Sequence, residues 1–253
     1  MLRWIGGRRV GTLVIDIGNT RLAWRYRGSS GDLRFGTASH HAITDVFDEL
    51  PQAHKIAISS VRRDHEGEIQ NWLDSTSRSD VTWIRSGADL TSNVLTEEPD
   101  KTGADRALCA LAWGARSEGR GAVIIDAGSA VTVDAVTAAG ELLGGWIAPG
   151  LYSLRIGLQQ VTPSLPDPTG ATDDGHWSRE SRSAVHGGLH TLFVAGVKAL
   201  RERVLKGLEA DTMTVVTGGD AQPLVDSIEG AIHQPGLVLD GLETILNRDR
   251  EHE

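Results

Sequence analysis

The sequence predicts an α/β protein built from two similar halves, and three observations lead to this prediction. Apolar runs of strand length alternate with segments of helical periodicity along the whole chain, an order typical of helix-covered sheets. The pattern LVIDIG near the start recurs 110 residues later as VIIDAG, which indicates a duplication. The 253 residues are enough to bury a large core without disulfides. We expect two lobes, at residues 1–118 and 119–253.

The first predicted strand ends in a carboxylate that is followed by a tight turn. Residues 13–15 are apolar, and the turn at Gly18 is typical of a hairpin that leads into a second strand over residues 21–26. Two interpretations of Asp16 stay open from these residues alone. It could cap the turn, or it could bind Mg²⁺ beside a phosphate held by backbone N–H groups and the Thr20 hydroxyl.

The rest of the first half continues the alternation. Residues 55–61 and 81–87 are predicted to be short buried strands, with a helix over residues 66–75 between them. A second helix follows, because apolar residues recur on one helical face at Ala104, Leu108, Leu111 and Ala115. Asp105 and Arg106 therefore fall in the first turn of this helix.

The second half repeats the strand and turn and then adds longer elements. After the strand pair of residues 122–136, the glycine-rich residues 141–151 are predicted to form a strand, a turn and another strand. A polar loop over residues 162–177 precedes a long helix over residues 181–205. The last predicted elements are a strand that starts at residue 213 and runs into Gly218, and a strand and final helix within residues 236–248.

The composition favours a cytoplasmic protein that acts on small molecules. A formal charge of −9 and a pI near 5.5 disfavour surfaces for nucleic acids or anionic membranes, which need concentrated Lys and Arg. No segment approaches the roughly 20 apolar residues of a membrane span, and the N-terminus lacks the apolar core of a signal peptide. The single cysteine, Cys109, lies in an apolar stretch and is predicted to be a reduced core residue.

Three carboxylates, Asp16, Asp105 and Asp126, stand beside glycines at predicted element ends. Glycine lets a ligand approach the backbone while an adjacent carboxylate holds a cation, an arrangement suited to phosphoryl transfer. The sequence has no P-loop, dinucleotide-binding G-x-G-x-x-G, nucleophile elbow or C-x-x-C motif. His186 and His190 have a spacing that can bind zinc, but without a third ligand we interpret them as a helix-surface pair.

Seven motifs in succession resemble those of type III pantothenate kinases, and they span nearly the whole chain. They are DIGNT (16–20), SSV (59–61), GADR (103–106), DAGSAVTVD (126–134), GGWIAPGL (144–151), TGGD (217–220) and LVLDGL (237–242). The resemblance implies two ribonuclease-H-like lobes with a nucleotide cleft between them, as in the acetate and sugar kinase, Hsp70 and actin superfamily. It implies ATP-dependent phosphorylation of pantothenate to 4′-phosphopantothenate, the first step of coenzyme A biosynthesis.

The resemblance also implies roles for individual residues. Asp105 would be the base that accepts the hydroxyl proton of pantothenate, with Gly103, Ala104 and Arg106 at the substrate. Asp16 would hold magnesium. The residues implied to bind ATP and its phosphates are Asp16, Ile17, Gly18, Asn19, Thr20, Arg21, Gly128, Ser129, Gly218 and Gly219. Asp126 would hold a monovalent cation, either potassium or ammonium.

The sequence departs from the family pattern at three positions of the implied sites. Ser129 stands where the family has threonine, Leu95 replaces a tyrosine of the pantothenate pocket, and Ser181 replaces a threonine that contacts the substrate. The resemblance and the apolar surplus of the long helix predict a homodimer whose pocket is completed by the partner subunit. Leu95 keeps an alternative open, in which the chain is a non-catalytic relative that serves as a regulatory or partner-binding module.

Overall fold

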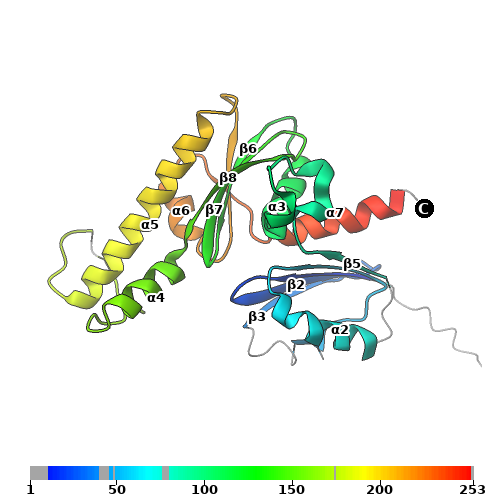
Figure 1. Ribbon diagram of the computed structural model, residues 1–253, viewed down its shortest axis with the longest axis horizontal. Coiled ribbons are helices and arrows are strands. Elements are labelled where there is room, and N and C mark those ends of the chain that lie inside the picture. Colours follow the sequence, from blue (N-terminus) through cyan, green and yellow to red (C-terminus); the bar gives the residue numbers. More distant parts are fainter. Residues whose placement is uncertain (1–10, 40–45, 48, 76–79, 174, 252–253) are drawn as a thin grey trace, which may run out of the picture. The chain divides into compact units, whose positions relative to one another are not determined.

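The structure is a computed structural model that describes residues 11–39, 46–47, 49–75, 80–173 and 175–251 (Figure 1). Its contacts divide the chain into two compact units, Met1–Ala112 with Val238–Glu253, and Trp113–Leu237. The C-terminal helix therefore groups with the first unit, whereas the predicted lobes placed it with the second. Each unit contains one five-stranded sheet.

The sheet of the first unit has the strand order β3-β2-β1-β4-β5. Its strands are β1 (Thr12–Ile17), β2 (Arg21–Arg27), β3 (Leu33–Ser39), β4 (Lys55–Ser60) and β5 (Val81–Ile84). The first three strands form an antiparallel meander, and β4 and β5 run parallel to β1. Because β1, β4 and β5 are parallel, their carboxyl ends lie at one edge of the sheet.

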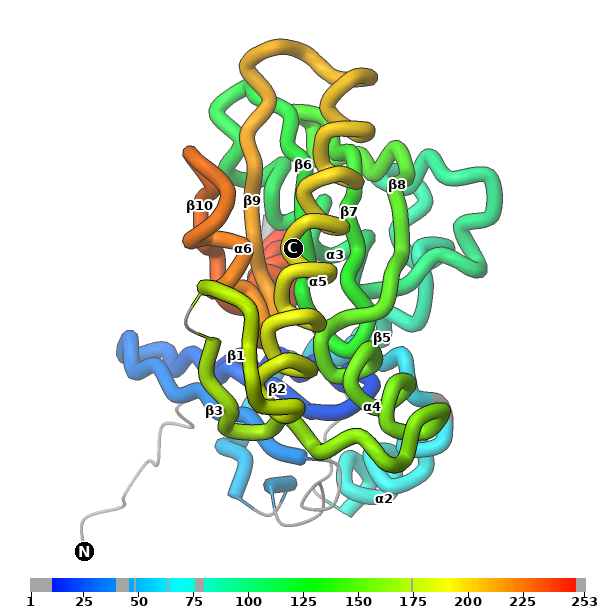
Figure 2. The backbone as a smooth tube through the Cα atoms, turned by 90° about the vertical axis from the view of Figure 1, so that its left-hand side faces the viewer, coloured from blue at the N-terminus to red at the C-terminus, as the bar shows by residue number. Residues whose placement is uncertain are grey.

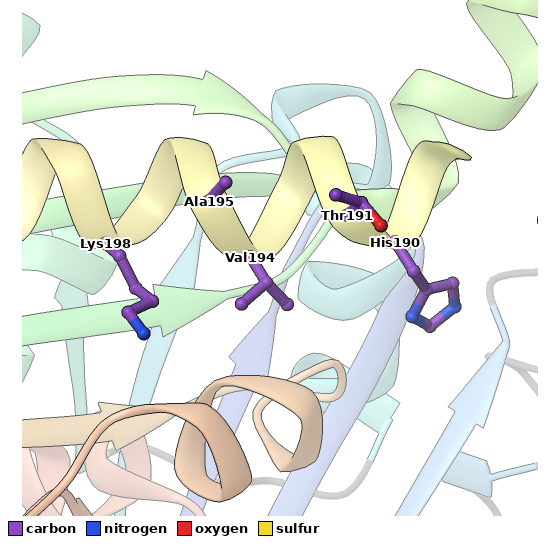
Figure 3. A pocket seen from close by; sticks show the side chains of 5 residues that line it. All are labelled: His190, Thr191, Val194, Ala195 and Lys198. Atoms are coloured by element: carbon purple, nitrogen blue, oxygen red, sulfur yellow. The ribbon is translucent and has the colours of Figure 1, made fainter. Parts of the chain in front are cut away.

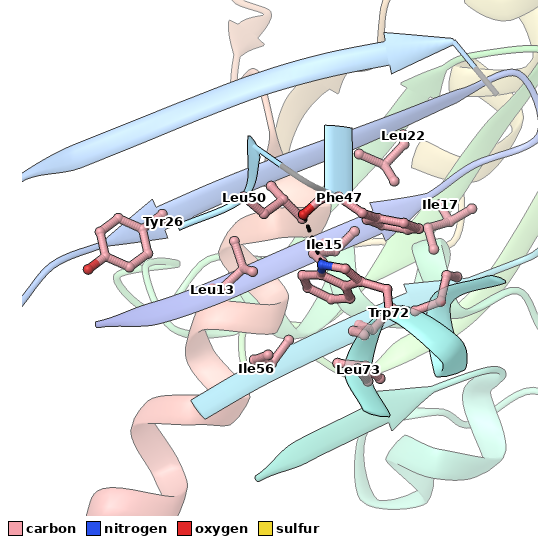
Figure 4. Packing of buried hydrophobic residues seen from close by; sticks show 12 residues of the cluster. Leu13, Ile15, Ile17, Leu22, Tyr26, Phe47, Leu50, Ile56, Trp72 and Leu73 are labelled. Carbon is pink, nitrogen blue, oxygen red and sulfur yellow. Dashed lines mark hydrogen bonds between the residues drawn. The ribbon is translucent and has the colours of Figure 1, made fainter. Parts of the chain in front are cut away.

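One face of this sheet packs on helix α2 (Glu66–Ser75) and forms the core of the unit (Figure 4). Strand alternation directs Leu13, Ile15 and Ile17 into that core. Trp72 of α2 stacks on the Phe47 ring at 4.9 Å, and its indole N–H donates to the Phe47 carbonyl at 2.8 Å. The intervening residues of each strand, Asp16 among them, consequently face the other side of the sheet.

On that other side lie most of helix α3 (Ala104–Gly114) and helix α7 (Leu237–Glu251). Arg25 of β2 bonds the Asp240 carboxylate of α7 at 2.5 Å. A Cβ placed on Gly241 would lie 2.3 Å from the Leu108 carbonyl oxygen, so the backbones of α7 and α3 approach closely. The described residues of this unit also form the short 3₁₀ helices η2 (Arg63–His65), η3 (Gly87–Asn93) and η4 (Pro99–Lys101).

The sheet of the second unit has the order β10-β9-β6-β7-β8. Its elements are β6 (Ala122–Ala127), β7 (Ala130–Val136), β8 (Leu142–Pro149), α4 (Leu151–Val161), α5 (Ser181–Leu205), β9 (Met213–Thr217), α6 (Gln222–Ser227) and β10 (Ile232–His233). Helix α5 lies along strands β6 and β7 (Figure 2) and buries Phe193 and Val197 against Val123 and Ile125. The meander followed by a parallel strand repeats the first unit, as the sequence repeat predicts.

The structure confirms several predicted elements and corrects others. Helices α2 and α5 have the predicted bounds, and Cys109 is buried in the core, as predicted. Residues 141–151 were wrongly predicted: β8 is one continuous strand followed by α4, because Gly145 lies flat against β7, where a Cβ would be 2.2 Å from the Val133 carbonyl oxygen. Ala115 lies beyond the end of α3 and is exposed.

The predicted strand before the last helix is also wrong, because residues 237–239 form the first turn of α7. A run of three apolar residues fits a strand or a helix equally well. Leu239, Leu242 and Leu246 are buried and follow one another at helical spacing, so the helix includes residues 237–239.

Candidate active site

Asp16 lies at the end of β1, on the face of the sheet opposite α2. Ser59 is its direct partner across β1 and β4, and the Ser59 hydroxyl donates to Asp16 Oδ1. Burial raises the pKa of Asp16 to about 7; the Ser59 hydrogen bond opposes this rise and the Asp105 carboxylate adds to it. The carboxylates of Asp16 and Asp105 are therefore close enough to repel each other.

Asp105 sits in the first turn of α3 and is held by its own neighbours. Its carboxylate folds over Gly103, where a Cβ would lie 2.4 Å from Asp105 Oδ1, and the backbone N–H of Arg106 donates to the same oxygen at 2.8 Å. Burial raises the pKa of Asp105, while this N–H and the Arg106 charge act in the opposite direction. The glycine of the GADR motif thus makes room for the carboxylate.

Asp16, whose charged form is disfavoured by burial and by the Asp105 carboxylate, is a natural place for a cation. Among the residues that the structure describes, no group of three or more His, Cys, Asp or Glu side chains is placed to hold a metal ion. Mg²⁺ does not need such a group, because it commonly binds proteins through one or two carboxylates and completes its shell with water and substrate phosphates. The Asp16 and Asp105 pair fits that manner of binding.

The turn after Asp16 exposes polar groups beside these carboxylates. The Gly18 N–H bonds the Arg21 carbonyl at 3.0 Å, closing the turn, and Asn19, Thr20 and Arg21 are exposed. Ile17 is buried in the core and anchors the turn from below. The turn can therefore present backbone N–H groups and a hydroxyl to an anion.

The segment that precedes α3 is folded into η3 and η4. Gly87 at the start of η3 donates its N–H to the Thr102 carbonyl at 2.8 Å, which brings this segment back to the GADR motif. Ala104 is fully buried, whereas the Leu95 side chain is 54% exposed. Leu95 is thus available to a substrate on the surface of the first unit.

In the second unit, the DAGS and TGGD motifs form one surface. Asp220 donates its backbone N–H to the Ala127 carbonyl at 2.9 Å. Gly218 has a φ of +92°, and a Cβ there would lie 2.4 Å from the same carbonyl oxygen, so only glycine fits. The predicted phosphate residues Gly128 and Ser129 and the predicted nucleoside residues Gly218 and Gly219 are thereby brought to one edge of the sheet.

Asp126 is flanked in the sheet by two threonines on the same face. Its register partners are Thr132 on β7 and Thr217 on β9, both buried. The Thr132 hydroxyl is buried and has no hydrogen-bond partner within the described part of the chain. A carboxylate next to an unsatisfied hydroxyl oxygen is a donor set that suits a monovalent cation.

A hollow of about 560 Å³ lies beside α5 and is lined by His190, Thr191, Val194, Ala195 and Lys198 (Figure 3). The Lys198 ammonium, at one end of this lining, donates to the Ser227 carbonyl of α6 at 3.0 Å. Burial and the neighbouring His186 lower the pKa of His190, and the carboxylates of Asp220 and Asp173 oppose this. Asp220 of the TGGD motif is thus close enough to influence the charge of His190.

Several residues at these sites had no predicted role. Ser59 belongs to the SSV motif, but only the strand register shows that its hydroxyl reaches Asp16. Thr132 lies inside the DAGSAVTVD motif, and His190 was interpreted as part of a surface pair. The His186 and His190 rings lie 4.3 Å apart between centroids in a tilted arrangement, which supports that pair as a local contact. Ser181 is exposed at the first residue of α5.

The family profile and the similar sequences found among known proteins point to the same family. A sequence profile described as type III pantothenate kinase matches residues 12–203. The type III pantothenate kinase of Alcanivorax borkumensis is 33% identical, over 94% of this chain and 99% of its own length. That of Marinobacter nauticus is 32% identical, over 92% and 97%.

Solved structures resemble the whole chain at lower identity. An activator of 2-hydroxyisocaproyl-CoA dehydratase from Clostridium difficile, with bound ADPNP, has a TM-score of 0.59 at 14% identity and covers 96% of both chains. A Campylobacter jejuni protein whose name assigns it to the Baf family of transcriptional activators has a TM-score of 0.61 at 21% identity, over 94% of this chain and 99% of its own. The chain shares the α/β fold of these solved structures, and it belongs to the type III pantothenate kinase family.

Proposed function

We propose that this protein transfers the γ-phosphoryl group of ATP to the primary hydroxyl of pantothenate, giving 4′-phosphopantothenate and ADP. The observation that carries the proposal is the proximity of the Asp105 carboxylate of α3 to Asp16 at the end of β1, beside an exposed turn that can bind phosphate. Such a pair offers both a cation site and a proton acceptor, the two groups that a phosphoryl transfer requires of the protein. This reaction opens the synthesis of coenzyme A.

Asp105 is the proposed base. The raised pKa makes its carboxylate a stronger proton acceptor than an ordinary aspartate, while the Arg106 N–H fixes its orientation. The Arg106 guanidinium would attract the carboxylate of pantothenate. Gly103, Ala104 and Leu95 complete the proposed substrate surface in this unit.

Asp16 and the following turn are the proposed site of Mg²⁺ and the ATP phosphates. When bound, Mg²⁺ neutralises charge on the transferred phosphoryl group. Asp16 must be ionised for this task, so cation binding has to displace the proton that burial favours. The backbone of Ile17, Gly18, Asn19, Thr20 and Arg21 would orient the phosphates.

The second unit supplies the remaining nucleotide contacts in this proposal. Gly128 and Ser129 would bind phosphate, and Gly218 and Gly219 would lie against the nucleoside. The hollow beside α5 has the mixed apolar and polar lining that a nucleobase needs, and its residue His190 lies within the electrostatic influence of Asp220. Asp126, with the unsatisfied Thr132 hydroxyl, would hold potassium or ammonium.

We also propose a homodimer in which Ser181 of one subunit contacts pantothenate bound by the other. The second unit exposes large apolar side chains that a partner could cover, including Leu192 of α5 at 67% exposure and Ile147 of β8 at 63%. Most other large apolar residues of α5 pack on its own sheet. Leu192 is therefore the large apolar residue of α5 that is left exposed and could pack against a partner subunit.

The direct test is an assay of the purified protein with ATP, Mg²⁺, K⁺ and pantothenate, in which phosphopantothenate is measured by mass spectrometry. We expect product, with less of it when Na⁺ replaces K⁺. Equal activity in the two salts would contradict the monovalent cation site. No product from folded protein would reject the kinase and favour the non-catalytic alternative. The helices that the structure describes include no candidate for a membrane span.

A further inference from the structure

The ends of strands β1 and β4 are tied together by three contacts in a row. The Ser59 hydroxyl donates to Asp16, the Val61 N–H donates to the Ile17 carbonyl at 3.1 Å, and Arg62 Nη1 donates to the Asn19 carbonyl at 3.1 Å. The first two contacts extend the pairing of the strands. The third reaches beyond the sheet, to the turn that we assign to the ATP phosphates.

Arg62 is held rigidly for a residue so close to the surface. Its Nε donates to Asp64 Oδ1 at 2.8 Å and its Nη2 donates to Asp64 Oδ2, a two-point pairing that fixes the plane of the guanidinium. Its backbone is fixed as well, because the Arg62 N–H donates to the Ser60 hydroxyl at 3.2 Å and that hydroxyl donates to the Arg62 carbonyl at 3.0 Å. Nη1 is thereby aimed at Asn19.

The bond to the Asn19 carbonyl has a consequence for the next peptide group. A trans peptide is planar, and its C=O and N–H point in opposite directions. A guanidinium that holds the Asn19 oxygen therefore also sets the direction of the Thr20 N–H. Within the exposed turn, this is a direct means of orienting a backbone donor before an anion arrives, and donors oriented in advance bind without loss of ordering free energy.

We propose that Arg62 is a positioning residue for the phosphate turn: braced by Asp64, it fixes the Asn19 and Thr20 peptide so that the turn is ready for the phosphates of ATP. The inference rests on the proposed function of that turn. It assigns a role to a side chain that belongs to none of the predicted site residues. It also explains why two exposed, oppositely charged side chains are arranged with such complete geometry next to Asp16.

If Arg62 and Asp64 formed an ion pair with no role in nucleotide binding, the variants would behave differently. Exposed ion pairs contribute little to stability, so Arg62→Ala would then change neither stability nor kinetics. Arg27 provides the matched control. It is also an exposed arginine in an ion pair, with Glu243 at 3.2 Å, but it pairs with Thr12 at the opposite end of β1.

The test compares Arg62→Ala, Arg62→Lys and Arg27→Ala with the wild type, by steady-state kinetics and by calorimetric titration with ADP and Mg²⁺. For Arg62→Ala we expect the KM for ATP to rise and the ADP affinity to fall by about tenfold or more, the loss typical of one charged hydrogen bond. The KM for pantothenate and the Tm should stay unchanged. Arg27→Ala should match the wild type in all four quantities.

Arg62→Lys separates positioning from simple charge. Lysine keeps the positive charge but cannot hold Asp64 at two points and Asn19 at once, so it should recover only a small part of the ATP affinity. Full recovery by lysine, or unchanged ADP affinity in Arg62→Ala, would overturn the proposal. If the wild type binds ADP but makes no phosphopantothenate, the proposed reaction fails while the ADP titrations still decide the role of Arg62.

Discussion

At the scale of single residues, Asp16 occupies a position that destabilises its charged form. Its folded pKa is about 7 and its ordinary value is 3.8, so between these pH values the folded protein binds more protons than the unfolded chain. The contribution of Asp16 to the free energy of unfolding therefore falls as pH rises from about 4 to 7. The charged form of Asp16 thus lowers the stability of the folded protein, and a bound cation would offset that cost.

We predict that Asp16→Asn stabilises the metal-free protein at pH 8, by about 2–4 kcal/mol, because the uncharged amide loses the burial penalty and can still accept the Ser59 hydrogen bond. At pH 4 the gain should largely vanish, since Asp16 is then protonated. Urea unfolding in EDTA at the two pH values measures this. Asp64→Asn, a change at an exposed carboxylate, should give no gain at pH 8. Equal stability of Asp16→Asn and wild type at pH 8 would contradict the assignment.

Asp105 yields a prediction about chemistry. Asp105→Asn is nearly isosteric and can still accept the Arg106 N–H bond, so the fold should be retained. Loss of the proton acceptor should lower kcat by about 10² to 10⁴ while ADP affinity stays near the wild-type value. Single-turnover kinetics and ADP titration measure the two effects. A variant with wild-type kcat would show that another group is the base.

At the scale of elements, the packing of α7 on α3 depends on Gly241. A Cβ at this position would meet the Leu108 backbone, which cannot move aside as a flexible side chain could. We predict that Gly241→Ala destabilises the protein by about 1–3 kcal/mol, the usual effect of overpacking. The control is Gly67→Ala in α2, where a Cβ would have no neighbour within 4 Å and alanine should be neutral or slightly stabilising. Similar midpoints of urea unfolding for both variants would contradict the close packing.

At the scale of the whole molecule, the proposed dimer makes Leu192 a test residue. Leu192→Glu places a charge on the apolar part of α5 that remains exposed, so we predict a monomer by light scattering where the wild type is a dimer. Phe35→Glu is the control, because Phe35 is equally large and 74% exposed but lies on β3 in the other unit. A wild-type monomer, or a dimer that survives Leu192→Glu, would contradict this interface.

A shared pantothenate site can be tested by mixing two inactive variants. Asp105→Asn and Ser181→Trp should each be inactive alone, but a mixed dimer keeps one site with both wild-type residues. Random exchange at equal concentrations should therefore restore about a quarter of the sites. Mixtures that stay inactive after proven subunit exchange would show that Ser181 does not contribute to its partner's site.

The sequence by itself determined much of this protein, because local periodicity and turn chemistry act over few residues. The helix over residues 66–75 has its exact predicted bounds, since its apolar spacing is helical and acidic residues occupy its first turn. The repeated strand and Asp-x-Gly turn predicted the start of the antiparallel meander in each half, and they placed Asp16 and Asp126 at strand ends. The GADR motif placed Asp105 in the first turn of a helix.

Only the tertiary structure decided what depends on residues far apart in the chain. Ser59 reaches Asp16, and Arg62 reaches Asn19, across a separation of 43 residues that strand pairing alone brings together. The pKa of Asp16 follows from burial and from Asp105, neither of which is local. The apolar residues 237–239 are compatible with a strand or with a helix. The close approach of Gly241 to Leu108 exists only once α7 packs on α3. Local patterns fix which elements form, whereas partners, burial and charge interactions arise only when those elements pack.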